Sequence, residues 1–408
     1  MGRRHMRTSA ERIRSWDGPA ILSFGFRPFF LLAGLWAALA MFLWLFMLTG
    51  RQVLPTAFDP TGWHSHEFVF GYLGAVIAGF LLTAVPNWTG RLPVVGWSLG
   101  GLVLLWLLGR TAVLVSGHLP AVLVAVADLA LPVALALFLL REIMAGKNWR
   151  NLPVLGLLLL FALANAGFHI EAAAGRIIHD GYGLRLGLAA VVMLIALIGG
   201  RIIPSFTRNW LAQRGAERMP VPFSRADTVV LAVTGLALLS FVAAPEGRPT
   251  ALACTLAGVA NLWRLIRWQG VRTGAEPLLW VLHVAYALLG LGFLAVAAAA
   301  AGLMPASAAR HVWFAGAIGL MTLAVMSRAS LGHAGRPLHA GPGVTAVYLA
   351  LILAVVARVA AGFAPGAVWL LHLSALAWII SFGGFTAIYW PILTRPRTAR
   401  KQPMRAPV

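Results

Sequence analysis

The sequence predicts an all-α, polytopic membrane protein with twelve transmembrane helices and both termini in the cytoplasm. Its composition is the first observation: 60% of the 408 residues are hydrophobic, only 11% are charged, and the mean hydropathy is +0.84. A soluble domain carries about 25% charged residues, so this chain lacks the polar surface that a cytosolic enzyme needs. The lengths of the apolar runs and the distribution of basic residues are the other two observations.

Twelve apolar runs along the chain approach the length of about 20 residues that a bilayer-spanning helix needs. We place the spans at 28–48, 64–85, 97–116, 120–140, 153–173, 184–204, 227–243, 249–268, 277–300, 310–328, 343–362 and 366–392. The prediction is therefore one transmembrane domain at 28–392, between a polar cytoplasmic segment at 1–27 and a basic cytoplasmic tail at 393–408. Because no cleavable signal peptide precedes the first span, we expect the N-terminus to stay in the cytoplasm.

Lysine and arginine residues test this layout. With alternating spans, 25 of the 32 basic residues lie at the cytoplasmic ends and seven lie outside, as the positive-inside rule requires. The net charge of +20 then reflects this topology and contact with anionic lipid headgroups. Nucleic-acid binding is not expected, because the basic residues are spread over many short loops.

The three spans at 64–85, 184–204 and 310–328 run from outside to inside and end in similar Pro-, Gly- and Arg-rich sequences. These sequences occupy 86–91, 199–208 and 327–337. The three spans are the second, sixth and tenth of the twelve, so each follows the previous one by four helices. The spacing suggests a threefold repeat of four helices, although such residues are common at helix ends.

A single cysteine, Cys254, limits the redox chemistry available to the chain. It excludes an intrachain disulfide, an iron–sulfur cluster with four cysteine ligands and a CxxCH haem attachment site. Any metal would therefore be held mainly by His, Met, carboxylate or tyrosine ligands.

Eleven histidines fall into two layers on this topology. The outer layer comprises His64, His66, His118, His169, His179, His311 and His372, and the inner layer comprises His283, His333 and His339, with His5 in the N-terminal segment. Ionisable groups in a membrane are costly and usually functional. One such histidine is more often an interhelical hydrogen-bond partner, but several on different helices at one depth favour metal or haem ligation.

Small or polar residues share the helix faces of three of these histidines. The faces are formed by His64 with Glu67, Gly71 and Ala75; His169 with Asn165, Ala162 and Ala166; and His283 with Tyr286, Ala287 and Gly290. Small residues let a partner helix pack closely, or they leave room for a flat macrocycle beside the imidazole.

The densest polar group is the segment WHSHE at 63–67. On a regular helix His64 and His66 point about 160° apart, so they cannot bind one metal ion from such a helix. Either the segment is not helical or the two histidines serve different partners. Glu67 could orient a ligating histidine or lie on a proton path.

Taken together, motifs spread over nearly the whole chain resemble the NnrS family of bacterial membrane proteins. They are GFRPFF at 25–30, WHSHE at 63–67, AGFLLTAVPNWTG at 78–90, Asn165 with His169, IGGRIIPSFTRN at 198–209, PLLWVLH at 277–283 and VMSRASLGHAGRP at 325–337. Ser65 and Ala334 depart from the family pattern, and neither is a candidate ligand.

The resemblance implies a haem protein of nitric oxide metabolism in the bacterial inner membrane, with copper as a further candidate metal. The family's polar positions correspond here to His64, His66, Glu67, Asn165, His169, Arg201, His283, His311, Arg328, His333 and Arg336. The outer set of His64, His66, His169 and His311 would hold a haem b, with copper beside it. The inner pair, His283 and His333, would hold a second haem or bind quinol.

From this resemblance we expect a haem-dependent reductase that converts nitric oxide to nitrous oxide. Glu67 or Glu171 would supply protons from outside, and quinol or an external carrier would supply electrons. Arginines of the inner rim would pair with haem propionates, or simply form a solvated positive rim; they are Arg27, Arg91, Arg201, Arg208, Arg328 and Arg336.

Two other functions fit the same sequence. A transporter of copper, haem or an anion would also have twelve spans, repeats and helices interrupted by Pro or Gly. Its charged groups would lie near the midplane, where Asp128 is the one carboxylate and has no evident basic partner. A nitric oxide sensor or sink would share the haem ligands but would need no proton path.

Overall fold

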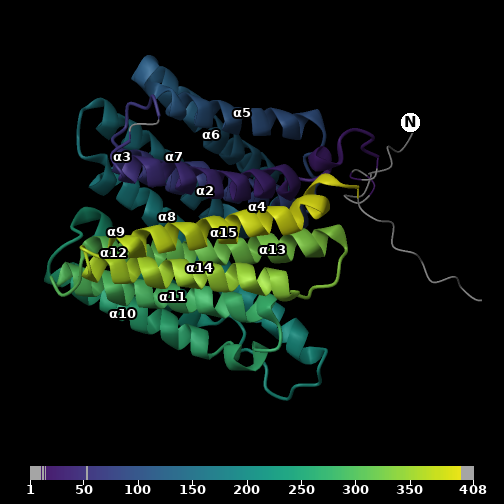
Figure 1. Cartoon of the computed structure of the whole chain (residues 1–408). Coiled ribbons are helices and arrows are strands. Elements are labelled where there is room, and N and C mark those ends of the chain that lie inside the picture. The colour runs from purple at the N-terminus through teal and green to yellow at the C-terminus, as the bar shows by residue number, and fades with distance from the viewer. Residues whose placement is uncertain (1–10, 12, 14, 52–53, 397–408) are drawn as a thin grey trace, which may run out of the picture.

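The computed structural model describes residues 11, 13, 15–51 and 54–396. The remaining parts of the predicted N-terminal segment and of the predicted tail lie outside the described residues. In this described part of the chain, twelve long helical segments follow one another, arranged as Figure 1 shows. They are α2 (Phe26–Leu48), the continuous segment α3 (Pro60–His66), η2 (Glu67–Tyr72) and α4 (Leu73–Thr89), α5 (Trp97–Leu114), α6 (Ala121–Gly146), α7 (Leu152–Ala173), α8 (Tyr182–Ala212), α9 (Arg225–Ala243), α10 (Arg248–Ile266), α11 (Pro277–Ala300), the continuous segment α12 (Ala306–His311), η7 (Val312–Gly319) and α13 (Leu320–Ala334), α14 (Pro342–Phe363) and α15 (Val368–Thr394).

Eleven of these segments are long and apolar enough to cross a membrane. The remaining one, α10, has 19 residues, but Asn261 and Arg264 lower its hydropathy. Arg264 is buried, and its Nε donates to Asp227 Oδ1 of α9 at 2.8 Å, so its charge is neutralised inside the bundle. The described part of the chain is therefore an all-α, multi-pass membrane protein, as predicted.

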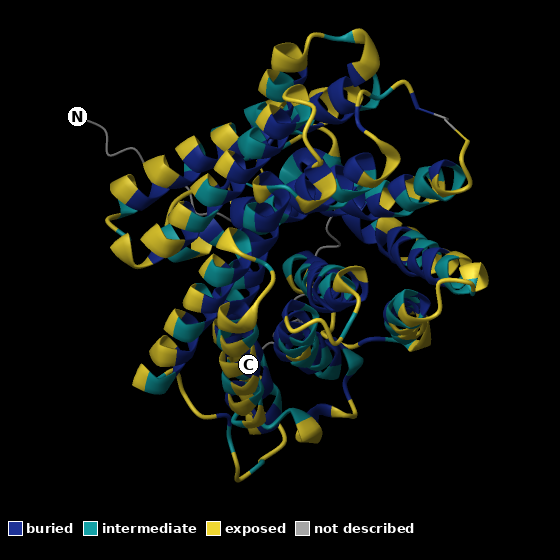
Figure 2. Cartoon of the chain, turned by 90° about the vertical axis from the view of Figure 1, so that its left-hand side faces the viewer, coloured by how far each residue is buried: buried dark blue, intermediate teal, exposed yellow. Residues whose placement is uncertain are grey.

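The second, sixth and tenth segments form the centre of the bundle. In their most apolar windows 78%, 72% and 78% of the residues are buried, against 33–61% in the other candidate spans. Figure 2 shows this buried interior surrounded by helices with exposed outer faces. These are the three segments whose inner ends have similar sequences, and the threefold repeat itself stays a prediction.

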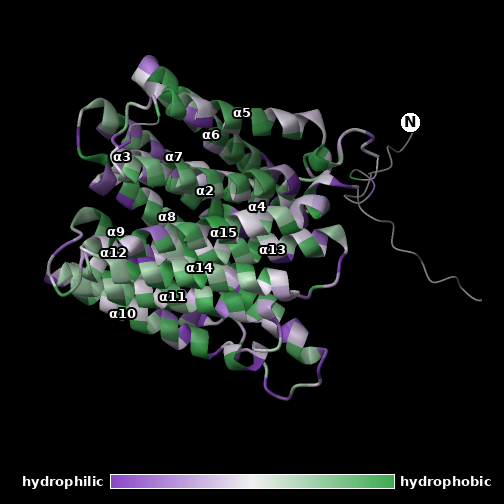
Figure 3. Cartoon of the chain, viewed as in Figure 1, coloured by the Kyte–Doolittle hydropathy of each residue, from purple (hydrophilic) through white to green (hydrophobic). Residues whose placement is uncertain are grey.

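The outer helices pack on one another in three groups: α5 with α6 and α7, α9 with α10 and α11, and α14 with α15 and α2. α5 and α6 pack on each other at one edge and α10 lies at the other, next to α11 (Figure 1). α15 packs against α2, which brings the first and last spans together. Large apolar side chains such as Leu104, Val126 and Leu236 are exposed on the outer helices, and polar residues gather toward the helix ends (Figure 3). An exposed apolar belt is what contact with lipid requires.

Two central segments contain a π-helical stretch directly after a histidine. η2 follows His66, and η7 follows His311. π-helical turns are rare and frequently lie at functional sites, because the extra residue rotates the helix beyond it. The two π-helical stretches therefore point to the regions around His66 and around His311 as candidate functional sites.

Candidate functional site

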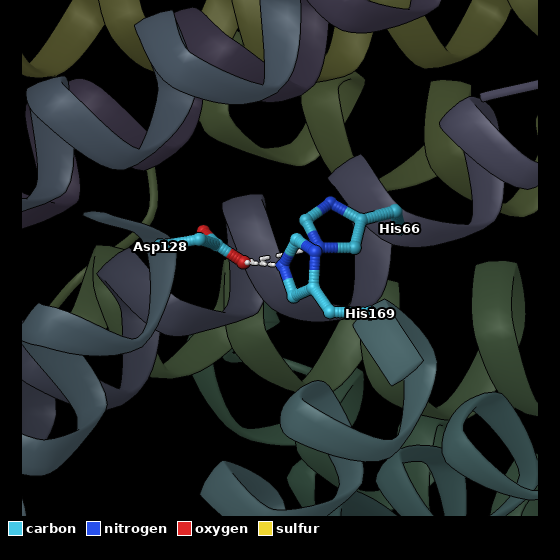
Figure 4. Close-up of side chains that lie close together, drawn as sticks. All are labelled: His66, Asp128 and His169. Atoms are coloured by element: carbon cyan, nitrogen blue, oxygen red, sulfur yellow. Dashed lines mark hydrogen bonds and ion pairs between the residues drawn. The ribbon is translucent and has the colours of Figure 1, made fainter. Parts of the chain in front are cut away.

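Three buried side chains from three helices meet in the bundle: His66 of α3, Asp128 of α6 and His169 of α7 (Figure 4). Both imidazoles direct Nε2 at one carboxylate oxygen, Asp128 Oδ2, at 3.1 Å from His66 and 3.0 Å from His169. One potential ligand atom from each residue lies within 4.8 Å of the others. Two imidazoles and one carboxylate form a donor set that suits a transition metal.

Arg110 of α5 joins this group to a second carboxylate. Its Nη1 donates to Glu67 Oε1 at 2.5 Å, and its Nη2 donates to Asp128 Oδ1. Glu67 Oε1 also lies 3.1 Å from His66 Nδ1, and Glu67 Oε2 accepts from Trp36 Nε1 at 2.7 Å. All of these charged groups are at least nine-tenths buried.

Asn165 completes the arrangement, which we call the ionic cluster: Glu67, Arg110, Asp128, His66, His169 and Asn165. Its Nδ2 donates to Asp128 Oδ2 at 2.8 Å, and its Oδ1 lies 3.2 Å from His66 Nε2. The sequence places Asn165 on one helix face with His169, and in the structure Asn165 contacts His66 and Asp128.

With both carboxylates ionised and both histidines neutral, the ionic cluster carries one net negative charge. Glu67 and Asp128 contribute two negative charges, and Arg110 contributes one positive charge. Both ring nitrogens of His66 face acceptor oxygens. A second proton on His66, or a metal ion in its place, makes the cluster neutral, and an uncompensated buried charge is costly. The arrangement is therefore suited to hold one exchangeable cation.

A separate cavity of about 430 Å³ is bounded by α2, α3, η2, α12, η7 and α15, and we call it the histidine cavity. Its walls are largely apolar and include Trp44, Phe68 and Phe314. His64 and His311 line it from α3 and α12. It thus differs from the ionic cluster in having open space beside its imidazoles.

The two cavity histidines are held differently. The His64 ring stacks on Trp44 with centroids 4.5 Å apart, and among the described residues its buried Nδ1 has no hydrogen-bond partner. The His311 Nδ1 lies 2.7 Å from the carbonyl oxygen of Ser307. If Nδ1 donates to this carbonyl, Nε2 is left as a lone-pair donor, which is the usual arrangement of a metal-ligating histidine.

Charged residues line one part of the histidine cavity. Arg310 pairs with Asp180 at 2.8 Å, and Arg358 Nη2 donates to Ser307 Oγ at 2.7 Å. His179, which lies outside the family motifs, also lines the cavity. Two guanidinium groups therefore stand beside an otherwise apolar space.

The predicted outer set of four histidines thus divides between two places. His64 and His311 line the histidine cavity, whereas His66 and His169 contact Asp128. Because residues 60–66 are helical, the second of the two alternatives for WHSHE holds, and the two histidines serve different partners.

The expectation that Asp128 lacks a basic partner is wrong. Arg110 lies against it, because α5 and α6 pack side by side. Neither Arg110 nor Asp128 was among the predicted site residues. Both are charged residues within apolar runs, at 97–116 and 120–140, and that signal alone marks an intramembrane site.

Glu171 caps a helix. Its two carboxylate oxygens accept from the backbone N–H groups of Tyr182 and Gly183, at 2.8 and 3.1 Å, at the start of α8. A role in proton supply stays a prediction for this residue.

The inner histidines contact different helices. His283 Nε2 lies 2.9 Å from Thr207 Oγ1 of α8, whereas the His333 ring packs against Phe24 and Phe26. Binding of a second haem or of quinol by these two histidines stays a prediction.

Four of the six inner-rim arginines have contacts within the protein, and Arg201 and Arg336 are exposed. The four contacts are Arg27 with the carbonyl oxygen of Arg395, Arg91 with Glu142, Arg208 with the carbonyl oxygen of Pro220, and Arg328 over the Phe206 ring. Pairing with propionates stays a prediction, and the arginines of the histidine cavity are instead Arg310 and Arg358.

A family model described as NnrS protein matches residues 20–397 of the chain. No curated protein gives a significant match. The matched range contains every residue of the ionic cluster and of the histidine cavity.

Proposed function

Because the chain belongs to the NnrS family, we propose that it is a haem protein that binds nitric oxide and reduces it to nitrous oxide. The family match makes it a membrane protein of the nitric oxide response. Haem binding, copper binding, reduction and location in the bacterial inner membrane are the proposal.

The histidine cavity is the observation that carries this proposal. Its volume of about 430 Å³ lies within the roughly 300–1,000 Å³ typical of cofactor clefts. Its residues fit haem, which is a flat apolar macrocycle with two propionates: the walls are largely apolar, and three imidazoles and two guanidinium groups line the space. Either His311 or His64 would hold the iron, which leaves a coordination position for nitric oxide. Arg358, and Arg310 beside Asp180, would pair with the propionates.

A bound haem would supply an iron at which nitric oxide can coordinate. The chain's own residues would prepare that chemistry. Ser307 orients the His311 ring through its carbonyl group, and Trp44 and Phe68 hold the His64 ring between them. The largely apolar walls would admit an uncharged gas.

Reduction consumes two nitric oxide molecules, two electrons and two protons, and releases nitrous oxide and water. We propose quinol as the electron donor. Glu67 is the proposed proton donor, because it lies in the ionic cluster and on the same helical segment as the cavity residue His64. We also propose that copper is bound by His66, His169 and Asp128. If this copper ion is monovalent, its single positive charge neutralises the ionic cluster.

Absorption spectra of the purified protein, oxidised and reduced, with and without nitric oxide, test the haem assignment. We expect a b-type spectrum that shifts with nitric oxide, and its loss in His311→Ala or His64→Ala. His372→Ala is the matched control, because His372 also bonds the carbonyl four residues before it but is exposed. Normal haem in both cavity variants would remove the assignment.

A cation transporter is the second candidate function, and the ionic cluster favours it. Transporters place ion-binding groups within the membrane, often beside helix irregularities. Here Asp128 is buried on α6, and Glu67 begins the π-helical stretch η2. Copper uptake into proteoliposomes, abolished by Asp128→Asn in a protein that contains no haem, would support this function over the reductase.

A further inference from the structure

A second cavity, of about 90 Å³, lies among four helices, α4, α7, α8 and α13. Its lining consists of apolar side chains, one glycine and one threonine: Leu73, Val76, Ile77, Phe80, Leu81, Val154, Leu158, Val191, Leu194, Ile195, Ile198, Gly199, Ile202, Met321, Thr322 and Val325. Three of its four helices belong to the central segments of the bundle. We call it the central cavity.

The central cavity lies between the two candidate sites. It shares Leu73 with the histidine cavity. It shares Ile77 and Leu158 with a small space of about 10 Å³ that is lined by Arg110, Asp128 and Asn165 of the ionic cluster. Leu73 and Ile77 are one turn apart on α4, so a single helix face borders all three spaces.

The lining offers water no binding site. Its single side-chain hydroxyl, on Thr322, lies 2.7 Å from the Ile318 carbonyl oxygen and 2.7 Å from the Tyr72 hydroxyl. The Thr322 hydroxyl can therefore donate to the carbonyl while accepting from Tyr72. Cavities without free polar groups stay dry and accept small apolar molecules.

The central cavity is accessible from one end. Phe80, Ile198, Ile202 and Val325 are half-buried at one end, whereas Leu73, Val76 and Thr322 at the other end are buried. The half-buried residues lie toward the predicted cytoplasmic ends of α4, α8 and α13. The opposite end is separated from the histidine cavity by the Leu73 side chain and by the hydrogen bond between Tyr72 and Thr322, which line different cavities.

We propose that the central cavity binds nitric oxide as an uncharged diatomic gas and delivers it to the histidine cavity past Leu73. Its volume is several times the roughly 10–15 Å³ that one water-sized molecule needs, but it is too small for a macrocycle. Nitric oxide as the cargo rests on the proposed function. Gas binding by the cavity rests only on its size, its lining and its position.

Xenon tests gas binding without any cofactor. Xenon NMR on the full-length protein in detergent should show a bound population that Ile195→Phe abolishes, because the larger ring fills the cavity. Leu236→Trp is the matched control, since it adds bulk at an exposed position of α9. Absence of bound xenon in the unchanged protein, whether because the cavity is closed or because a lipid or detergent chain fills it, overturns the proposal. So does bound xenon that persists in Ile195→Phe.

Nitric oxide recombination after flash photolysis of the haem complex tests delivery. Ile198→Trp should slow recombination severalfold with an unchanged haem spectrum, and Leu236→Trp should have no effect. Leu73→Ala, at the border with the histidine cavity, should speed recombination. Unchanged rates in both cavity variants would overturn delivery. If the protein binds xenon but never incorporates haem, the central cavity stands and the proposed haem function fails.

Discussion

The ionic cluster contains His66 and the histidine cavity is lined by His64, two residues earlier on α3. The two regions nevertheless differ in packing, charge and polarity. The cluster is packed, charged and closed by hydrogen bonds among its own residues. The histidine cavity is open and apolar, and the His64 Nδ1 within it has no partner among the described residues. The comparison teaches that a small cation suits the first region and a larger apolar cofactor suits the second.

The largest expected effect comes from removing Arg110. Arg110→Gln leaves Glu67 and Asp128 facing each other without a cation, and breaking a buried ion pair costs roughly 3–5 kcal/mol. We expect a marked fall in the melting temperature of the detergent-solubilised protein. Arg336→Gln, at an exposed arginine, is the control, and equal melting of the two variants would show that the cluster does not stabilise the bundle.

The next prediction tests whether the two regions act separately. His169→Ala should lose bound copper and keep the haem spectrum, because His169 contacts Asp128 and does not line the histidine cavity. His311→Ala should show the reverse. Metal analysis alongside absorption spectra measures both, and joint loss of both metals in each variant would mean that the regions form one site.

Glu67→Gln separates turnover from binding. We expect nitric oxide to shift the haem spectrum as before, while nitrous oxide release with a quinol donor falls strongly, because the proposed proton donor is gone. Unchanged nitric oxide consumption would favour a sink without a proton path. Trp36→Phe is the companion variant, since it removes one hydrogen bond to Glu67 and leaves the carboxylate in place.

The smallest effect on stability is expected from removing the hydrogen bond that lies between the histidine cavity and the central cavity. Tyr72→Phe removes the hydrogen bond to Thr322, and interhelical hydrogen bonds in membranes contribute about 0.6 kcal/mol on average. Thermal unfolding should therefore shift only slightly. Thr255→Val, whose exposed hydroxyl bonds its own helix, is the control, and a shift as large as that of Arg110→Gln would contradict this account.

Hydropathy was sufficient to predict the helical segments and the multi-pass character of the chain. Periodicity also separated His64 from His66, because residues two apart on a helix point in nearly opposite directions. These features are local: each depends on residues within one span, and water and lipid act on every span in the same way.

Helix neighbours and helix rotation were decided only by the tertiary structure. His64 and His311 are far apart in sequence and meet on one cavity, and Arg110 reaches Asp128 because α5 packs on α6. The π-helical turns after His66 and His311 also change the face that follows them. Lipid chains are as apolar as leucine, so hydropathy cannot tell a lipid-facing side from a helix-facing one, and only packing and interhelical hydrogen bonds make that choice.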